Sequence, residues 1–225
     1  LSCFVLTDGS SYLMLPMAKD YKRIGEGDTG LNTGGMGAIS PVPFVTEEFK
    51  EKIETQIIKP TIEGLKKDNL PFKGFVFIGL IKVGEEPKVI EYNVRMGDPE
   101  TEVVIPRIKN DFLAILKAVN EERLDTVTLE IDSSAAATVV AVSGGYPEAY
   151  EKGKTISGLK QLDGKMIFHA GTKQEGDSIK TSGGRVLAIT SFGKHHQEAV
   201  KSSYEILSKI KYEGINYRSD IGFDL

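Results

Sequence analysis

A strand-like segment, residues 89–95, constrains this chain more than any other part of it. Polar and apolar side chains alternate there with a period of two, which is typical of a strand with one buried face. The alternation predicts that Glu91, Asn93 and Arg95 share one face of the strand. The apolar side chains then take the opposite face: Ile90, Tyr92 and Val94.

That row of polar groups suits a particular ligand. Mg²⁺ prefers one or two protein oxygens and completes its shell with phosphate oxygens, so a carboxylate and an amide beside a guanidinium favour Mg²⁺ that carries phosphates. A solvated strand face with a cross-strand salt bridge explains the same pattern equally well.

Hairpins and helices surround this segment. Alternation and turn residues predict strands at 2–6, 12–17 and 74–83, and the last of these turns back at 84–87 to pair with the segment at 89–95. Thr46 and the acidic residues after it open a helix that Pro60 is expected to kink. A second helix is predicted at 111–120.

The pattern changes near residues 124–134, where we expect a domain boundary. Beyond it come strands and glycine turns, with strands predicted at 136–143, 166–171 and 184–192 and a final helix at 195–211. The prediction is an α+β fold in two parts, residues 1–129 and 130–225, with antiparallel sheets joined by hairpins. Because the chain begins at Leu1 and enters a strand at once, we expect a piece of a longer protein.

Charge and composition exclude several classes of function. A net charge of −4 and a pI near 5.6 argue against a general nucleic-acid binder. One cysteine, Cys3, rules out an internal disulfide, and three scattered histidines make a histidine metal cluster unconvincing. No apolar run of about 18 residues is present, so we expect no membrane span and a cytoplasmic protein.

A glycine-rich loop covers residues 19–37. Its Gly25-x-Gly27-x-x-Gly30 matches the dinucleotide fingerprint, but no good helix start follows, and the acidic residues inside it would repel phosphate. Lys22 and Arg23 add positive charge to the loop, and Asp28 could hold an ammonium group. A surface loop whose glycines only make turns is the alternative, although ordering so many glycines is costly unless a ligand is bound.

Several motifs together carry a resemblance to one family. They are Asp20-Tyr-Lys-Arg23, Gly27-Asp-Thr-Gly30, Asn32-Thr-Gly-Gly-Met-Gly37, Glu91-x-Asn93-x-Arg95-x-Gly-Asp-Pro-Glu100, Ser143-Gly-Gly-Tyr-Pro147, Phe168-His-Ala-Gly-Thr172, Gly183-Gly-Arg-Val186 and Tyr217-Arg-Ser-Asp-Ile-Gly222. In this order the chain resembles the phosphoribosylamine–glycine ligases (glycinamide ribonucleotide synthetases) of the ATP-grasp superfamily. The likeness spans nearly the whole chain.

The resemblance implies a reaction and a set of substrates. Such ligases use ATP to phosphorylate glycine, and the amine of 5-phosphoribosylamine then attacks the glycyl phosphate. The products are glycinamide ribonucleotide, ADP and phosphate, in purine biosynthesis. The fold implied is an ATP-grasp subdomain, an antiparallel sheet with helices, followed by a small β-rich C-terminal domain with a terminal helix.

The resemblance also assigns roles to the residues singled out above. Glu91 and Asn93 would hold Mg²⁺ or Mn²⁺ against the ATP phosphates, Arg95 would stabilise negative charge on the transferring phosphoryl group, and Asp98 would orient Arg95. The glycine loop would line the site for glycine and phosphoribosylamine through five residues: Lys22, Arg23, Asp28, Asn32 and Thr33.

Parts of the family pattern are absent from the sequence. The amino-terminal half, with the domain that helps to bind phosphoribosylamine and the ATP lid, is missing, so we expect this chain alone to be inactive and that half to be its partner. Two alternatives stay open at this point. One is another ATP-grasp carboxylate–amine ligase or carboxylase, and the other is a scaffold module that has kept the fold without catalysis.

Overall fold

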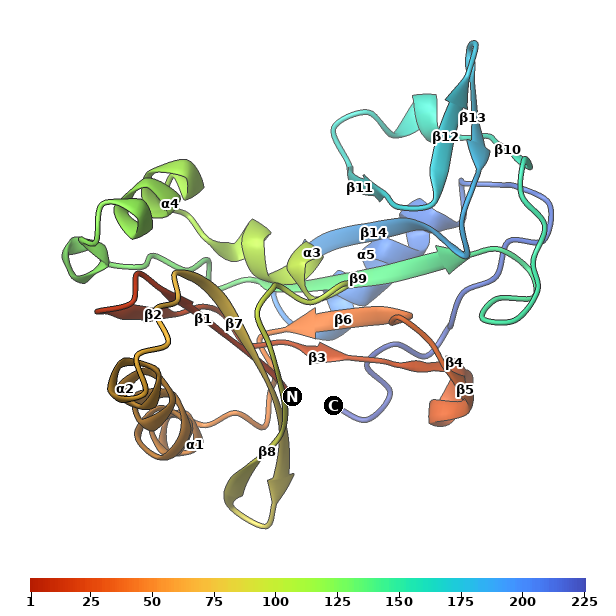
Figure 1. Cartoon of the computed structure of the whole chain (residues 1–225). Helices are drawn as coiled ribbons and strands as arrows, with labels where there is room; N and C mark the ends of the chain where they lie inside the picture. Colours follow the sequence, from red (N-terminus) through yellow and green to blue (C-terminus); the bar gives the residue numbers. More distant parts are fainter.

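The computed structural model describes residues 1–225 and contains two main antiparallel sheets (Figure 1). The first has the strand order β2-β1-β7-β8. Its strands are β1 (Ser2–Thr7), β2 (Tyr12–Met14), β7 (Gly74–Val83) and β8 (Glu86–Asn93). The predicted hairpins β1–β2 and β7–β8 are confirmed. The strand predicted at 89–95 begins earlier and ends at Asn93, because the chain bends after that residue.

One face of this sheet is covered by a long helical segment (Figure 1). It comprises α1 (Glu47–Ile53), a π-helical turn (Glu54–Ile58) and α2 (Lys59–Lys67), and the Thr46 hydroxyl caps it by accepting from Phe49 N at 3.1 Å. Pro60 lies at the start of α2. A π turn widens the helix where the proline lacks an N–H and crowds the preceding turn, which explains how the helix continues past this residue.

The opposite face of the first sheet packs on shorter helices. These are α3 (Thr101–Val104), a 3-10 turn (Ile105–Arg107), α4 (Phe112–Asn120) and a second 3-10 turn (Leu124–Thr126). Phe4 and Phe77 of the sheet share a core there with Val103 and Ile115 of the helices. The helix predicted at 111–120 is confirmed, and Asp111 caps it through Leu113 N at 2.9 Å.

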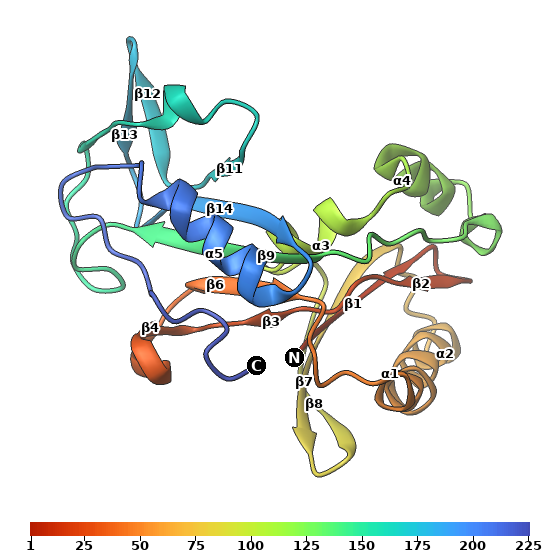
Figure 2. The same cartoon turned by 180° about the vertical axis from the view of Figure 1, so that it is seen from behind.

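The second sheet has five strands in the order β11-β14-β9-β6-β3. They are β3 (Lys19–Asp20), β6 (Gly37–Ser40), β9 (Ala135–Val142), β11 (Met166–His169) and β14 (Arg185–Gly193). Every residue of β9 is buried, because the strand lies in the middle of the sheet and is apolar on both faces. The helix α5 (His196–Leu207) covers one face of this sheet, as Figure 2 shows from behind, and is shorter than the predicted 195–211.

Two small sheets complete the fold. The glycine-rich loop contains the hairpin β4 (Arg23–Gly25) and β5 (Thr29–Asn32), joined by a 3-10 turn at Glu26–Asp28. Beyond β9 a three-stranded sheet projects from the molecule (Figure 1). It consists of β10 (Thr155–Ile156), β12 (Thr172–Glu175) and β13 (Ser178–Thr181), with a 3-10 turn at Leu159–Leu162 nearby.

The predicted α+β class with antiparallel sheets is confirmed. The division at residues 129 and 130 stays a prediction, and the topology adds a relevant fact: β3 and β6 precede that point but pair within the second sheet, where β6 lies beside β9. None of the helices has both the length and the apolar character needed to cross a membrane.

Candidate functional site

The candidate site begins with a row of residues across the first sheet. Ser2 of β1 and Glu91 of β8 both pair with Gly79 of β7. Two residues further along β8, Asn93 pairs with Phe77 of β7. Because alternate residues of a strand point to the same side, Glu91 and Asn93 share a face, as the alternation predicted. A β-carbon on Gly79 would lie 3.0 Å from Glu91 Cγ, so the glycine leaves room for the carboxylate.

Two details of the predicted strand are wrong. The register shifts between Gly79 and Leu80, so Ile90 occupies a bulge and lines the same cavity as Glu91, although the alternation had placed it on the opposite face. Arg95 lies beyond the end of β8, and its Nη1 donates to the Met96 carbonyl at 3.0 Å. The guanidinium is therefore near the strand end and exposed.

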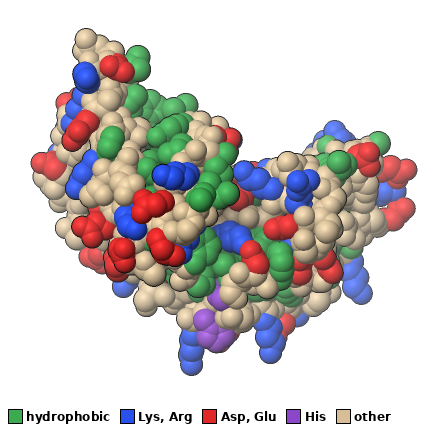
Figure 3. Space-filling view, turned by 90° about the horizontal axis from the view of Figure 1, so that it is seen from below, with side chains coloured by type: hydrophobic (Ala, Val, Ile, Leu, Met, Phe, Trp, Pro, Cys, Tyr) green, Lys and Arg blue, Asp and Glu red, His purple; other side chains and the backbone are tan.

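A cavity of about 320 Å³ opens beside Glu91 and brings the two predicted regions together. Five of the predicted site residues line it: Lys22, Arg23, Asp28, Asn32 and Glu91. In the space-filling view from below, basic and acidic side chains gather around the depression between the two lobes (Figure 3). The glycine loop and the polar strand thus line one cavity, even though about sixty residues of chain separate them.

Lys22 links the acidic groups on the two sides of this cavity. Its Nζ lies 3.9 Å from Glu91 Oε1 and 3.6 Å from Asp20 Oδ2, and half of the Lys22 side chain is exposed. Such exposed pairs contribute little to stability, so Lys22 can change partner at low cost when a phosphate or carboxylate binds.

Glu100 is a buried acid at the edge of the site that the sequence pattern did not single out. Its Oε1 accepts from Ser2 Oγ at 2.8 Å. Burial raises the pKa of Glu100, and the charge of Asp20 adds to the shift. Nothing in the local sequence predicts this burial, because it depends on packing of the Gly97–Glu100 turn against β1.

Two of the predicted loop residues are engaged within the protein. Thr33 Oγ1 donates to the Lys22 carbonyl at 2.8 Å and accepts from Gly35 N at 2.9 Å, so it braces the loop. Asp28 forms an ion pair with Arg218, whose side chain is fully buried. Burial acts to lower the pKa of Arg218, but hydrogen bonds to Asp220 and Asp28 outweigh it and raise that pKa.

The prediction that Asp98 orients Arg95 is wrong. The Asp98 carboxylate instead pairs with Arg185, at 2.9 Å between Oδ1 and Nη1, while Arg95 turns to the Met96 carbonyl. Arg185 begins β14, so its approach to Asp98 depends on how the second sheet packs against the turn after β8. No short-range pattern contains that information.

The glycine loop does not have the geometry of a dinucleotide site. Gly25, Gly27 and Gly30 form the β4–β5 hairpin and its turn, and the residues after Gly30 continue as a strand. The helix N-terminus that would hold a pyrophosphate is therefore replaced by β5.

The residues present fit a divalent cation that is shared with a phosphate ligand. No three His, Cys, Asp or Glu side chains come together as a protein-only metal cage. Glu91 and Asn93 offer two oxygens on one strand face, and Glu91 lines the cavity, which matches the few protein ligands that Mg²⁺ takes when phosphates complete its shell.

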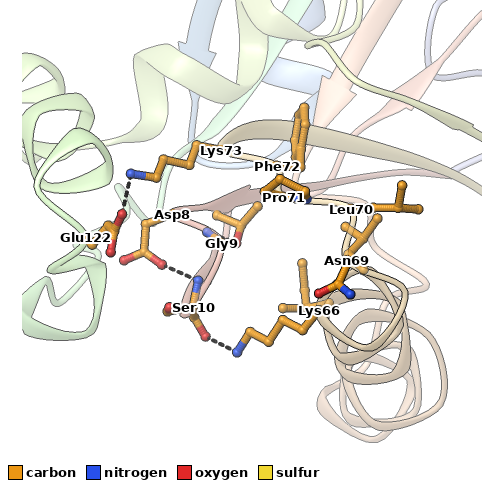
Figure 4. Close-up of a pocket in the computed structure, with 13 residues that line it drawn as sticks. Asp8, Gly9, Ser10, Lys66, Asn69, Leu70, Pro71, Phe72, Lys73 and Glu122 are labelled. Atoms are coloured by element: carbon orange, nitrogen blue, oxygen red, sulfur yellow. Dashed lines mark hydrogen bonds and ion pairs between the residues drawn. The ribbon is translucent and has the colours of Figure 1, made fainter.

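A larger cavity, of about 570 Å³, lies between the β1–β2 turn and the end of α2 (Figure 4). Both of its lysines already have partners within the protein. Lys66 Nζ donates to the Ser10 carbonyl at 2.7 Å, and Lys73 pairs with Glu122 at 2.7 Å. None of the predicted site residues lines this cavity, so the smaller one beside Glu91 is the better candidate.

Sequence profiles of one family match most of the chain. The profile described as "Phosphoribosylglycinamide synthetase, ATP-grasp (A) domain" matches residues 1–101. The profile described as "Phosphoribosylglycinamide synthetase, C domain" matches residues 136–224. The first match contains the glycine loop and the polar strand, and the second contains Arg185 and Arg218.

Individual proteins show the same likeness. The phosphoribosylamine–glycine ligase of Chlorobaculum tepidum is 46% identical over 224 residues, which cover 98% of this chain and 53% of that protein. The bifunctional purine biosynthetic protein PUR2,5 of Pichia angusta is 47% identical over 98% of the chain and 28% of its own length. The crystal structure of the Thermotoga maritima phosphoribosylamine–glycine ligase matches with a TM-score of 0.89 and 35% identity, over 98% of this chain and 55% of that one. The chain thus spans about half the length, or less, of the relatives it matches.

Proposed function

Because the chain belongs to the phosphoribosylglycinamide synthetase family of ATP-grasp ligases, we propose that it forms part of an enzyme that joins glycine to 5-phosphoribosylamine. In this reaction the glycine carboxylate takes the γ-phosphoryl group of ATP, and ADP leaves. The amine of phosphoribosylamine then attacks the glycyl phosphate, and phosphate is released. The product is glycinamide ribonucleotide, an intermediate of purine biosynthesis.

One observation carries this proposal: Glu91 and Asn93 share a strand face, and Glu91 lines a cavity with five polar residues of the glycine loop. In the proposed site Glu91 and Asn93 would hold Mg²⁺ or Mn²⁺, which would neutralise charge on the ATP phosphates. Phosphoryl transfer depends mainly on positioning and electrostatic stabilisation. Arg95, exposed beyond the strand end, would stabilise negative charge on the transferring group or on the acyl phosphate.

The glycine loop is the proposed site for the two smaller substrates. Lys22 and Arg23 supply positive charge toward the cavity, and Asn32 supplies an amide on the same lining. Asp28 lines the cavity and is also paired with Arg218. We therefore assign it two roles: it anchors the loop, and it would bind the amine group of a substrate. Thr33 braces the loop through Lys22 and Gly35. We propose that the amino-terminal part found in the relatives completes the ATP site.

The test is product formation by the complete protein that carries this chain. With ATP, Mg²⁺, glycine and freshly generated phosphoribosylamine, we expect glycine-dependent phosphate release and glycinamide ribonucleotide, identified by mass spectrometry. Phosphate release with bicarbonate or formate instead of glycine would assign another ATP-grasp ligase or carboxylase. A complete protein that releases no phosphate from ATP with glycine, bicarbonate or formate would support a scaffold without catalysis and contradict the proposal.

A further inference from the structure

The guanidinium of Arg185 lies at the junction of the two predicted site segments. Arg185 is the first residue of β14, in the second sheet. Its Nη1 donates to the Gly34 carbonyl at 2.6 Å and to the Asp98 carbonyl at 2.9 Å, and it lies 2.9 Å from Asp98 Oδ1. One nitrogen therefore joins the glycine loop to the turn that follows the polar strand.

The glycines of the loop are required for this contact. A β-carbon on Gly34 would lie 2.9 Å from Arg185 Cζ, so any side chain there would displace the guanidinium. A β-carbon on Gly35 would lie 2.3 Å from Pro99 Cδ. The loop thus presses directly on the turn at Asp98 and Pro99, with no side chain of its own in between.

A second residue of the C-domain match binds the other backbone group of Gly34, its N–H. Gly34 N donates to Tyr146 Oη at 2.9 Å. The Tyr146 ring in turn rests on Gly184, where a β-carbon would lie 2.2 Å from Cδ2. The N–H and C=O of Gly34 are therefore both bound by residues of the C-domain match, Tyr146 and Arg185.

Charge and burial favour a fixed arrangement. The Arg185 side chain is about four-fifths buried, with 20% of its surface exposed. A charge-assisted hydrogen bond from a guanidinium to a carboxylate or carbonyl is stronger and more directional than a neutral one. A lysine ammonium is a compact charge on a flexible stem, and it cannot reproduce the planar geometry of this junction.

We infer that Arg185 is a positioning residue for the ligase reaction, acting through Gly34 and Asp98 rather than on substrate. It fixes the loop segment that carries Asn32 and Thr33 against the turn that follows Arg95. The expected effect on the reaction rate rests on the proposed function. The contact by which Arg185 holds the loop against the turn does not depend on that function. A displacement of about 1 Å between reacting groups can lower a rate about 100-fold, so loss of this contact is expected to act on catalysis.

The experiment compares Arg185→Met and Arg185→Lys with a control, Arg123→Met, in the complete protein that carries this chain. Arg123 is an exposed arginine that pairs with Glu121. The first readout is amide hydrogen exchange at residues 33–36 and 97–100. We expect exchange there to be about 10-fold faster or more in both Arg185 variants, with the buried strand β9 unchanged.

The second readout is steady-state kinetics with glycine as the varied substrate. We expect kcat to fall about 10- to 100-fold in Arg185→Met, with a smaller fall in Arg185→Lys and none in Arg123→Met. Unchanged exchange at residues 33–36, or a kcat within twofold of wild type despite faster exchange, would overturn the inference. Should Arg185→Met unfold, Arg185→Lys decides by the same two readouts.

Failure of the proposed function gives a different result. In that case the wild-type protein itself makes no glycinamide ribonucleotide. The exchange comparison still decides whether Arg185 holds the loop against the turn, because it needs no substrate.

Discussion

Arg218 and Asp28, 190 residues apart in the sequence, form an ion pair that ties the C-terminal segment to the glycine loop. Arg218 also holds Asp220 through two bonds of 2.8 Å, from Nε and Nη2. The Arg218 guanidinium lies over the Tyr21 ring, with its Cζ 5.3 Å from the ring centroid. Asp220 further accepts from Gly27 N at 2.7 Å, so the loop is anchored at several points to residues near the chain end.

The two carboxylates that hold Arg218 should differ in their effect on stability. Asp220→Asn removes the bidentate partner of a fully buried guanidinium, and we expect the free energy of unfolding to fall by about 3–5 kcal/mol. Asp28→Asn leaves that partner in place, and Asp28 is 43% exposed, so a loss of about 1 kcal/mol is expected. Urea denaturation of both variants measures the difference, and equal losses would contradict this account.

The carboxylate of Glu91 should govern the metal requirement. Glu91→Gln keeps the shape of the side chain but removes its charge, so the complete enzyme should need about tenfold more Mg²⁺ for half-maximal activity, or more. Glu86→Gln is the matched control, because Glu86 lies on the same strand but pairs with Lys52. Equal Mg²⁺ titrations for the two variants would count against Glu91 as a metal ligand.

Glu102 should make stability depend on pH. Burial and the charge of Asp98 raise the pKa of Glu102 to about 7, against the opposing charge of Arg185, and Glu100 adds a small further rise. A carboxyl group whose pKa is raised by folding stabilises the folded state while it is protonated. This stabilisation is fully present below the unfolded-state pKa of 4.5 and is lost as the pH rises through the folded-state pKa of about 7.

Glu102→Gln removes this titration. Compared with the variant, the wild-type chain should therefore lose stability between pH 5 and pH 8 in urea titrations. Glu148→Gln, at an exposed position, is the control and should follow the wild type. Parallel pH profiles of the wild-type chain and Glu102→Gln would show that the Glu102 pKa is not raised.

The glycines of the loop should not be equivalent. Gly35 has φ +116° and faces Pro99, so Gly35→Ala should lower the free energy of unfolding by about 2–4 kcal/mol and reduce activity. Gly27 has φ +62° with open space around it, so Gly27→Ala should cost only about 1 kcal/mol. Thermal unfolding of the two variants measures the difference, and a smaller loss at Gly35 would be inconsistent with the observed contact.

The chain by itself should not complete the reaction. Its site cavity is open, and several apolar side chains of the neighbouring β7–β8 hairpin are exposed: Ile81, Val83, Val89 and Ile90. We expect purified residues 1–225 to give no detectable glycinamide ribonucleotide, measured by mass spectrometry. Product formation by this chain alone would contradict the proposed need for the amino-terminal part.

Local pattern was enough to predict the polar face of β8. The period of two along the strand placed Glu91 and Asn93 together, and the register with β7 confirms it. The same pattern could not reveal the bulge at Ile90, because a bulge arises from the pairing of two strands. It also missed the end of β8, so Arg95 was expected on the strand.

Partners far apart in sequence account for most of the remaining differences. The strand β6 is four residues long and is formed by its pairing with β9, about a hundred residues later. Asp98 was assigned to Arg95, its neighbour in the sequence, yet its partner is Arg185. Such contacts depend on how the two sheets pack, and neither propensity nor periodicity reports on them.

The path of the chain between the sheets limits how this protein could have been assembled. The polypeptide enters the first sheet with β1, crosses to the second with β3 and β6, returns with β7, and crosses again with β9. No single cut divides it into two self-contained pieces. A recombination event that replaced the part of the chain after β8 would leave β6 to pair with an unrelated strand in place of β9. We therefore expect the two sheets to have been inherited together.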